Sequence, residues 1–435
     1  MFFKFRSILL FPRKIVGSHV VLGVSQFKKV FMRSNCRVRS NFLVRVLIGA
    51  VVVFCGLTVQ AQQSTPAAQP TADEINALKA EYEALAATCR QSMLNVWQAE
   101  VRYFDSTRDE SIEVRKEWEQ LKVECQSQID KLAEVATKLF DAQEKPSPEL
   151  AELVSRVQEK TLRDGFPSEA FRIGKKLIAV YPDMKKAEMV TALAAIKVNE
   201  FDFAKKYYDE NKEAIEAIEP EYSKLFGSID NLVTQFEREQ QFREQDAKNE
   251  LPLVTIETNR GVVKIELFED QAPETVANFI SLTEQGFYDD LTFHWVLKGF
   301  AAETGVYTRR RTPSDVNVNY FIADEFDRED VRHHFRGSLS LITSEAANTG
   351  NERFVICLEP VPFLDGRKTV FGRVVKGMEV LDGITHTYQL SEKGEPEQIP
   401  EVKHDYIVKA SVTRKRADSE YKINKIPRVN PGDSQ

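Results

Sequence analysis

Leu253-Val-Thr-Ile-Glu-Thr-Asn-Arg-Gly-Val-Val-Lys-Ile-Glu-Leu-Phe268 is the first of a series of short β-rich runs in this chain of 435 residues. Its two halves, residues 253–258 and 262–268, flank Asn259-Arg260-Gly261, a turn in which glycine can take a positive φ. Two such runs joined by a short glycine-containing turn predict a β-hairpin. The preceding chain has a helical pattern, so a domain boundary is expected at Leu251.

More β-rich runs follow this hairpin, with two helices among them. One helix is expected to begin at Pro273 and end near Gly286, since proline suits a first helical turn and glycine follows a last one. A second is expected at residues 378–384. The other runs are residues 291–296, 337–342, 354–358, 369–375 and 406–413. This pattern predicts a closed antiparallel β-barrel over residues 251–415, followed by a flexible tail at residues 416–435.

The C-terminal domain, residues 251–415, resembles over essentially its whole length the cyclophilins, a family of peptidyl-prolyl cis–trans isomerases. The resemblance rests on short phrases that occur in the family's order. They are Gly261-Val-Val-Lys-Ile-Glu-Leu-Phe268, Ala272-Pro-Glu-Thr-Val-Ala-Asn-Phe279, Gly286-Phe-Tyr-Asp289, Thr292-Phe-His294, Asp324-Glu-Phe326, His334-Phe-Arg-Gly-Ser-Leu-Ser340, Phe354-Val-Ile-Cys357, and Phe363-Leu-Asp-Gly366 with Thr369-Val-Phe-Gly372.

The resemblance implies a proline-containing polypeptide as ligand and rotation about an X–Pro bond as the reaction. Partial double-bond character gives that rotation a barrier of about 18–20 kcal/mol. Catalysis requires interactions that are stronger in the twisted state, where the prolyl nitrogen can accept a hydrogen bond. In the family an arginine directly after Phe-His provides them, and an apolar pocket holds the proline ring. The resemblance implies no metal and no cofactor.

The catalytic positions implied by the resemblance are altered in this chain. Trp295 stands after Phe293-His294 where the family has its arginine. An indole has one neutral N–H donor, whereas a guanidinium has five and a positive charge. Glu303 replaces a neutral amide. We therefore expect Trp295, His294 and Glu303 to occupy the catalytic positions.

The implied substrate pocket is partly retained. Phe300, Phe363 and Leu364 keep its apolar character, although Phe363 replaces a tryptophan. The family's Phe-Phe pair becomes Phe354-Val355, and Lys368 replaces a histidine. The predicted substrate-binding residues are Phe300, Phe354, Val355, Phe363, Leu364 and Lys368.

Two functional interpretations remain open. In the first, the protein is an isomerase of reduced activity, and an arginine from Arg309–Arg311 or Arg353 supplies the missing donor. In the second, it is a non-catalytic adaptor or chaperone that keeps the barrel and binds proline-rich segments. Loss of a donor aimed at the transition state typically costs about 10²–10³-fold in rate, so the substitutions permit either interpretation.

The N-terminus has the pattern of an export signal. Residues 1–62 carry ten Lys and Arg and no acidic residue, and the apolar run 46–59 precedes Gln60-Ala61. This predicts a signal peptide within residues 1–61 and a protein of the periplasm or cell envelope. An uncleaved segment acting as a membrane tether remains an alternative, and Met32 is an alternative start to Met1. The rest of the chain has a net charge of −7 − 10 = −17, which argues against nucleic-acid binding.

Residues 62–250 have helical patterns after a short linker at residues 62–72. Thr71 and Glu74 form a capping-box motif, and apolar residues repeat every three or four positions in two runs. This predicts an α-helical hairpin over residues 73–147. Its apolar face is either an intramolecular core or a coiled coil between two copies of the chain. Cys89 and Cys125 would lie on it, with or without a disulfide.

Residues 148–250 contain a weak internal repeat. Gly165-Phe-Pro-Ser-Glu-Ala170 and Asn199-Glu-Phe-Asp-Phe-Ala204 place an alanine at a separation of 34 residues. This is the period of tetratricopeptide repeats. It predicts a helical-repeat-like region, either a peptide-binding groove or a plain helical spacer. The expected fold is therefore multidomain: all-α in the N-terminal part and a cyclophilin-like barrel in the C-terminal part.

Overall fold

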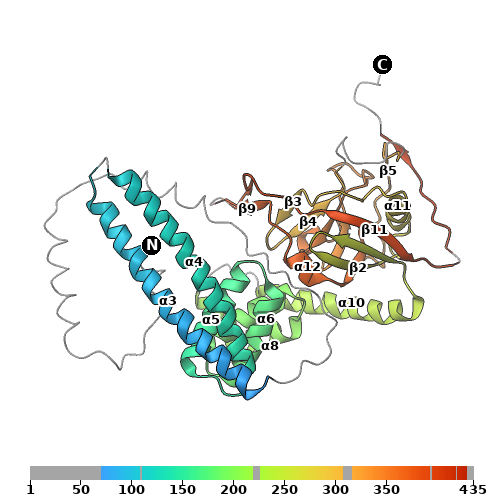
Figure 1. The fold of residues 1–435 in the computed structure, drawn as a ribbon. Coiled ribbons are helices and arrows are strands. Elements are labelled where there is room, and N and C mark those ends of the chain that lie inside the picture. The colour runs from blue at the N-terminus through green and yellow to red at the C-terminus, as the bar shows by residue number, and fades with distance from the viewer. Residues whose placement is uncertain are drawn as a thin grey trace. The chain divides into compact units, whose positions relative to one another are not determined.

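A computed structural model describes residues 70–107, 110–218, 226–306, 316–391, 394–417 and 419–428 (Figure 1). The predicted signal segment at residues 1–61, most of the linker and the Arg309–Arg311 run lie outside these residues. The described chain divides into two compact units, one up to Val157 and one from Gln158 onward. None of the described helices has the length and apolar character needed to span a bilayer.

The first unit is built on a helical hairpin. Helices α3 (Ala72–Asp105) and α4 (Ser111–Ala142) run antiparallel side by side (Figure 1), and the division between the units falls within the next helix, α5 (Pro148–Arg163). The predicted capping box is confirmed, because Glu74 N donates to Thr71 Oγ1 and Thr71 N donates to Glu74 Oε2. Cys89 and Cys125 are buried in the seam as free thiols.

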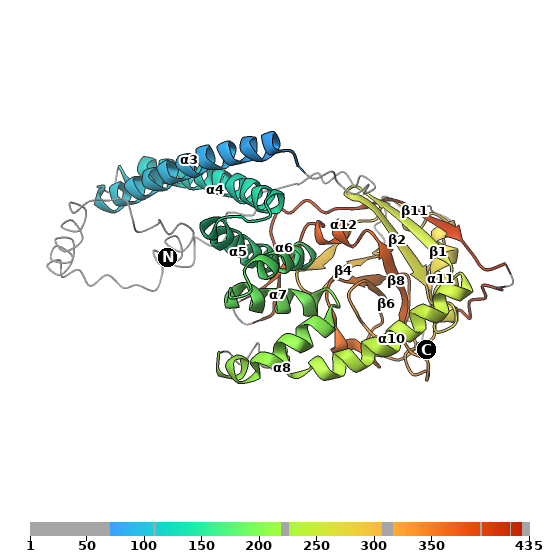
Figure 2. The same cartoon turned by 90° about the horizontal axis from the view of Figure 1, so that it is seen from below.

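The second unit begins with further helices. They are α6 (Pro167–Val180), α7 (Lys185–Lys197), α8 (Phe201–Ile218) and α10 (Ile229–Asn249). Ala170 and Ala204, the two alanines of the predicted repeat, are both fully buried in one apolar cluster. A tetratricopeptide-like groove stays a prediction. Helix α10 runs beside the sheet that follows it (Figure 2).

The β-rich part of this unit forms one large sheet in the strand order β10-β9-β3-β4-β7-β6-β8-β2-β1-β11. Helices α11 (Pro273–Glu284) and α12 (Met378–Asp382) accompany it, with a short 3₁₀ helix, η1 (Pro362–Leu364). The strands of the sheet are β1 (Leu253–Thr258), β2 (Gly261–Leu267), β3 (Trp295–Leu297), β4 (Ala301–Thr304), β6 (Ser338–Leu341), β7 (Phe354–Cys357), β8 (Val370–Lys376), β9 (Tyr388–Leu390), β10 (Pro396–Gln398) and β11 (Ile407–Arg414).

The predicted hairpin is confirmed, because Thr258 pairs with Gly261 in an antiparallel β1–β2 ladder. Gly261 has a φ of 146°, which favours glycine at this turn. One face of the sheet and α11 enclose an apolar core rich in aromatic rings. In it Phe279 contacts both Phe354 and Phe371 edge to face or tilted, with centroids 5.2 and 5.3 Å apart.

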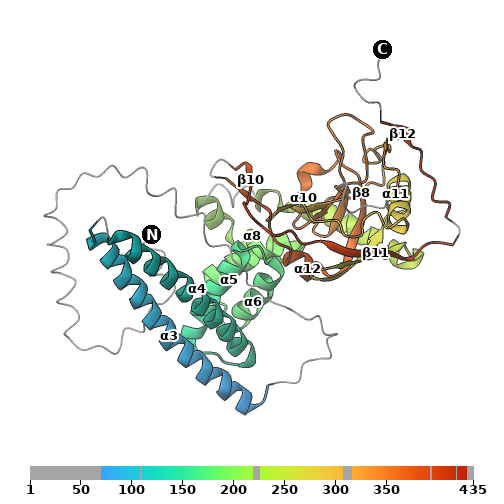
Figure 3. The same cartoon turned by 45° about the horizontal axis from the view of Figure 1, so that its top comes forward.

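The prediction of a closed barrel is wrong. The terminal strands of the sheet, β10 and β11, lie apart (Figure 3) and do not pair with each other in the described structure. The reason is that β9 pairs in parallel with β3, Leu297 opposite Tyr388, and so occupies the free edge of β3. The residues just before β3 do contact the start of β11, through an isolated bridge between Thr292 and Tyr406 and through backbone hydrogen bonds on either side of it, but β3 itself does not.

The prediction of a flexible tail from residue 416 also needs correction. Arg416 makes an ion pair with Asp270, and Arg428 makes one with Glu352 at 2.6 Å. The short strand β12 (Ile426–Pro427) pairs with β5 (Tyr320–Phe321). The flexible tail was predicted from the polar composition of this segment. Composition gives no information on these contacts, because their partners lie far away in the sequence. Residues 429–435 lie outside the described part.

Candidate functional site

Four neighbouring strands place a row of side chains on the outer face of the sheet. Trp295 of β3 lies opposite Glu303 of β4, Glu303 opposite Val355 of β7, and Val355 opposite Ser340 of β6. Successive side chains of a strand point to opposite faces. The neighbours of these residues in sequence therefore point to the core, and they are almost fully buried: Val296, Ala302, Phe354, Ile356 and Leu339.

Aromatic rings gather at the β3 end of this row. The rings of Phe300 and Phe363 are stacked, with centroids 5.7 Å apart and planes inclined by 6°. Trp295 meets Phe300 edge to face at 5.5 Å, and Tyr388 of β9 lies 5.8 Å from Trp295. Phe363 is 62% exposed. The predicted residues Phe300 and Phe363 thus form one aromatic surface open to solvent, next to Trp295.

Glu303 is the acidic centre of the row. Its Oε1 accepts a hydrogen bond from Arg353 Nε at 2.9 Å and a second, shorter one from Arg353 Nη2. His294 Nε2 lies 3.2 Å from the same oxygen. Burial opposes ionisation of Glu303, but the hydrogen bonds from His294 and Arg353 outweigh it and lower the pKa of its carboxyl group. Glu303 is therefore an anion at neutral pH.

Arg353 places a guanidinium group at the site from the start of β7, whereas the resemblance predicts the family's arginine position at Trp295 of β3. It directly precedes β7 and lies two residues before Val355, so the alternation of the strand directs both to the outer face. Glu303 engages two of its five N–H groups. The side chain as a whole is 37% exposed. Sequence reasoning named Arg353 only as one of several alternative donors.

Two predicted substrate-binding residues have other roles in this structure. Phe354 points into the core rather than the site, because it alternates with Val355 along β7. Lys368 donates from Nζ to the carbonyl oxygen of Thr343 at 2.8 Å and also to its hydroxyl group. Burial lowers the pKa of Lys368. Its ammonium group thus anchors the loop after β6. Val355 is on the outer face, and Leu364 is half-buried in η1.

His334 and Asp365 form a hydrogen-bonded pair that supports η1, and sequence reasoning gave neither residue a role. Asp365 Oδ1 accepts hydrogen bonds from His334 N at 2.9 Å and His334 Nδ1 at 2.7 Å. Burial opposes ionisation of Asp365, but the hydrogen bonds from His333 and His334 prevail and lower its pKa to about 2. His334 lies in the family phrase at residues 334–340, and Asp365 lies in the phrase at residues 363–366. Their presence in two family phrases was the only signal in the sequence that could have identified them.

Comparison with known proteins matches residues 253–412 to the family described as cyclophilin type peptidyl-prolyl cis-trans isomerase/CLD. Peptidyl-prolyl cis-trans isomerase-like 1 of Aspergillus oryzae is 34% identical over 161 residues, which is 37% of this chain and 94% of that protein. A peptidyl-prolyl cis-trans isomerase of Helicobacter pylori is 38% identical over 133 residues, 30% of this chain and 78% of that one.

A solved structure of a Cryptosporidium parvum cyclophilin, determined in the presence of the dipeptide Ala-Pro, also matches. It is 28% identical with a TM-score of 0.31, and the match covers 38% of this chain and 99% of that one.

Proposed function

Because this chain belongs to the cyclophilin-type peptidyl-prolyl cis–trans isomerase family through residues 253–412, we propose that it is an isomerase that uses Arg353 as its cationic donor. Its substrates are proline-containing polypeptides. The observation that carries the proposal is the Arg353–Glu303 pair beside the Phe300–Phe363 surface. The guanidinium is supplied by the residue before β7 rather than by β3.

The aromatic surface binds the proline ring in this proposal. A pyrrolidine ring is apolar and compact, and Phe300 and Phe363 offer apolar faces with Val355 nearby on the sheet. Removing the X–Pro bond from water also strengthens any hydrogen bond to its nitrogen. These residues bind the substrate and exclude water, but they do not stabilise the twisted state by themselves.

Arg353 then stabilises the twisted bond. A free guanidinium N–H group donates to the prolyl nitrogen once that nitrogen has become pyramidal. Bonds from a charged donor are roughly twice as strong as those from a neutral one, so Arg353 is a better candidate than the Trp295 indole. Glu303 fixes the guanidinium in place but also neutralises its charge. For that reason we propose an activity below that of an unpaired arginine.

Exchange spectroscopy by NMR on the full chain tests this function. An Ala-Pro-containing peptide is mixed with a substoichiometric amount of protein, and cis–trans exchange cross-peaks are recorded. Uncatalysed exchange takes tens of seconds or longer, so cross-peaks at sub-second mixing times demonstrate catalysis. Binding without such cross-peaks identifies the alternative function, a non-catalytic adaptor for proline-containing segments. An absence of both binding and exchange removes both functions.

The location and the assembly of the protein are proposals as well. Export to the cell envelope is supported by the basic and apolar segment before residue 62. Cell fractionation with N-terminal sequencing of the mature protein distinguishes a cleaved signal from a membrane tether. Dimerisation is supported by an exposed stripe on α3, with apolar residues at coiled-coil spacing: Leu94, Trp97, Val101 and Phe104. Sedimentation of wild type and Trp97→Ser tests it.

A further inference from the structure

Residues 332–336 connect the helices of the second unit to the proposed pocket. This segment, referred to below as the 332–336 segment, precedes β6. Three of its side chains, Arg332, Phe335 and Arg336, contact helical residues, whereas His334 contacts the residues around η1. The segment is therefore placed between two parts of the unit that are distant in sequence.

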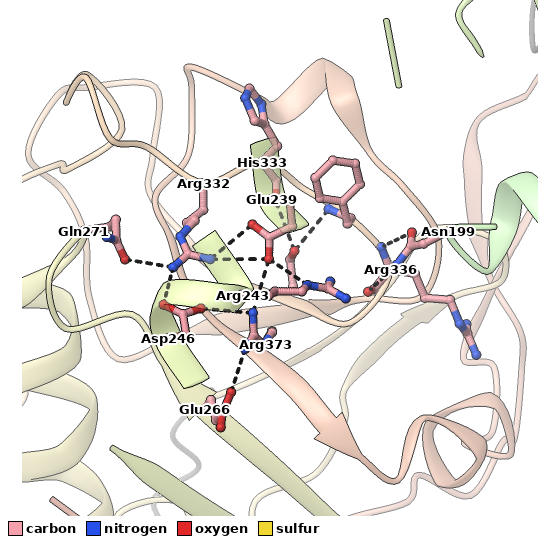
Figure 4. A network of polar contacts seen from close by, with 12 residues as sticks. Asn199, Glu239, Arg243, Asp246, Glu266, Gln271, Arg332, His333, Arg336 and Arg373 are labelled. Carbon is pink, nitrogen blue, oxygen red and sulfur yellow. Dashed lines mark hydrogen bonds and ion pairs between the residues drawn. The ribbon is translucent and has the colours of Figure 1, made fainter. Parts of the chain in front are cut away.

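Arg332 fixes the beginning of the segment to α10. Its side chain is fully buried. It donates to Glu239 Oε2 at 3.2 Å and to Asp246 Oδ1 at 2.7 Å, both on α10 (Figure 4). Its guanidinium carbon lies 4.2 Å from the ring centroid of Phe242 and 4.1 Å from that of Phe268. Charge pairing and ring stacking together hold this side chain in one orientation.

Phe335 and Arg336 fix the end of the segment. The Phe335 ring packs edge to face on Phe236 of α10 at 4.9 Å and lies 5.9 Å from Phe201 of α8. The side-chain amide of Asn199 accepts from Arg336 N and donates to Arg336 O, each at 3.1 Å (Figure 4). A pair of bonds to the N–H and C=O groups of one residue defines the position of the backbone more strictly than a single bond does.

His334, between these anchors, holds both ends of η1. Its carbonyl oxygen accepts from Val361 N at 2.8 Å, just before η1. Its N and Nδ1 atoms donate to Asp365, just after η1. Its Nε2 atom lies 2.9 Å from Ser340 Oγ. One buried residue thus connects the start and the end of the short helix to the sheet.

This support matters because η1 has no core of its own. None of its three residues is buried, and its middle residue, Phe363, is the exposed ring that stacks on Phe300. A single turn of 3₁₀ helix is not stable by itself. The orientation of Phe363 therefore depends on the two ends of η1 and on His334.

We propose that helices α8 and α10, with the turn before α8 that carries Asn199, position Phe363 through the 332–336 segment. Asn199, His334 and Asp365 are then positioning residues of the proline pocket. The helical region is then part of the substrate-binding machinery rather than a spacer. This inference rests on the proposed function only in calling the Phe300–Phe363 surface a proline pocket. The mechanical link from Asn199 to Phe363 can be tested without it.

The test uses fluorine NMR on the full chain with 4-fluorophenylalanine at position 363. Asn199→Gly removes both bonds to Arg336 and suits the positive φ of 67° at this position. In the free protein, we expect this variant to shift or broaden the resonance of residue 363. We also expect it to weaken binding of an Ala-Pro peptide by a factor of about 3 to 10, as for the loss of one or two hydrogen bonds. Asn199→Asp keeps the acceptor and should give a smaller change of the same kind.

Two controls separate positioning from general loosening. Glu401→Gly also places glycine at a positive φ of 57°, on an exposed residue. Gln158→Leu removes a buried side-chain bond to Thr191 within the helical region at 2.9 Å, away from the 332–336 segment. Both should leave the resonance of residue 363 in place, although Gln158→Leu lowers the melting temperature.

The inference is overturned if Asn199→Gly leaves the fluorine resonance of the free protein unchanged, or if Gln158→Leu moves it equally. Asp365→Asn serves as the positive control. Because Asp365 directly follows η1, this substitution should shift the fluorine resonance of residue 363 whether or not Asn199 has an effect. Failure of the proposed function has a different signature. The resonance then responds to Asn199→Gly but not to the proline peptide, even in the wild type.

Discussion

Arg353 Nε lies 2.9 Å from Glu303 Oε1, so a carboxylate of β4 fixes the guanidinium group of the residue that precedes β7. The pair lies on the same face of the sheet as Trp295, the residue that the resemblance predicts at the position of the family's arginine. In the proposed function, the guanidinium group of Arg353 takes the role of the family's arginine. The predictions below follow from this arrangement and from the contacts that support it.

Glu303→Gln should raise the isomerase activity. Glutamine keeps an oxygen to accept from Arg353 but removes the negative charge that neutralises it. Because the positive charge of Arg353 is then no longer compensated, it stabilises the twisted state more strongly, and we expect kcat/KM to rise by a factor of about 3 to 10. Protease-coupled isomerisation of a proline peptide measures it. A lower kcat/KM in this variant would mean that the anion itself is needed.

Asp365→Asn should destabilise the protein at neutral pH and much less in acid. The pKa of Asp365 is lowered from 3.8 to about 2, so its ionised form favours the folded state by about 2 kcal/mol above pH 4. This contribution decreases as the pH falls from about 4 towards 2. Urea unfolding of wild type and variant between pH 3 and pH 7 measures the difference, and a difference that does not vary with pH contradicts the assignment.

Arg332→Ala should destabilise the second unit strongly. The substitution removes one cationic partner from the buried carboxylates of Glu239 and Asp246. Arg373 remains near both carboxylates. Breaking a buried ion pair from one side typically costs about 3–5 kcal/mol. The control is Arg328→Ala, whose pair with Asp330 is exposed, and which should change the unfolding free energy by less than about 1 kcal/mol. Denaturant unfolding compares them, and equal effects exclude a structural role for the Arg332 network.

Arg428→Ala tests the C-terminal segment. Arg428 pairs with Glu352 at 2.6 Å, donates to the carbonyl oxygen of Tyr320 and covers the Phe321 ring. We expect a loss of about 1–3 kcal/mol of stability. Lys422→Ala, at a side chain that is 80% exposed, should have little effect. Thermal unfolding measures both, and an unaffected Arg428→Ala variant indicates that the segment is dispensable.

Local patterns predicted the local structure well. The hairpin at Gly261 and the capping box at Thr71 depend on residues that are close in sequence, and both are confirmed. Barrel closure was predicted wrongly because it depends on which strand occupies the edge of β3. That strand, β9, comes about ninety residues after β3 and has only three residues, and nothing in its own sequence indicates its partner.

The site was predicted only in part, because it too depends on contacts between residues that are far apart in sequence. Trp295 and Glu303 were identified by resemblance and do lie opposite each other across two strands. Phe354 was placed in the pocket although its alternation with Val355 directs it to the core. Arg353 could not be selected over the Arg309–Arg311 run, because the choice depends on which guanidinium reaches Glu303, a contact between residues 50 positions apart.

The most direct test of the central claim is kcat/KM for isomerisation by the full chain, measured for Arg353→Ala alone and together with Trp295→Arg. If Arg353 is the cationic donor, Arg353→Ala should lower kcat/KM by about 10²–10³-fold. The second substitution should then restore most of it, because it returns a guanidinium opposite Glu303. Unchanged activity in Arg353→Ala, with the wild type clearly active, would contradict the account.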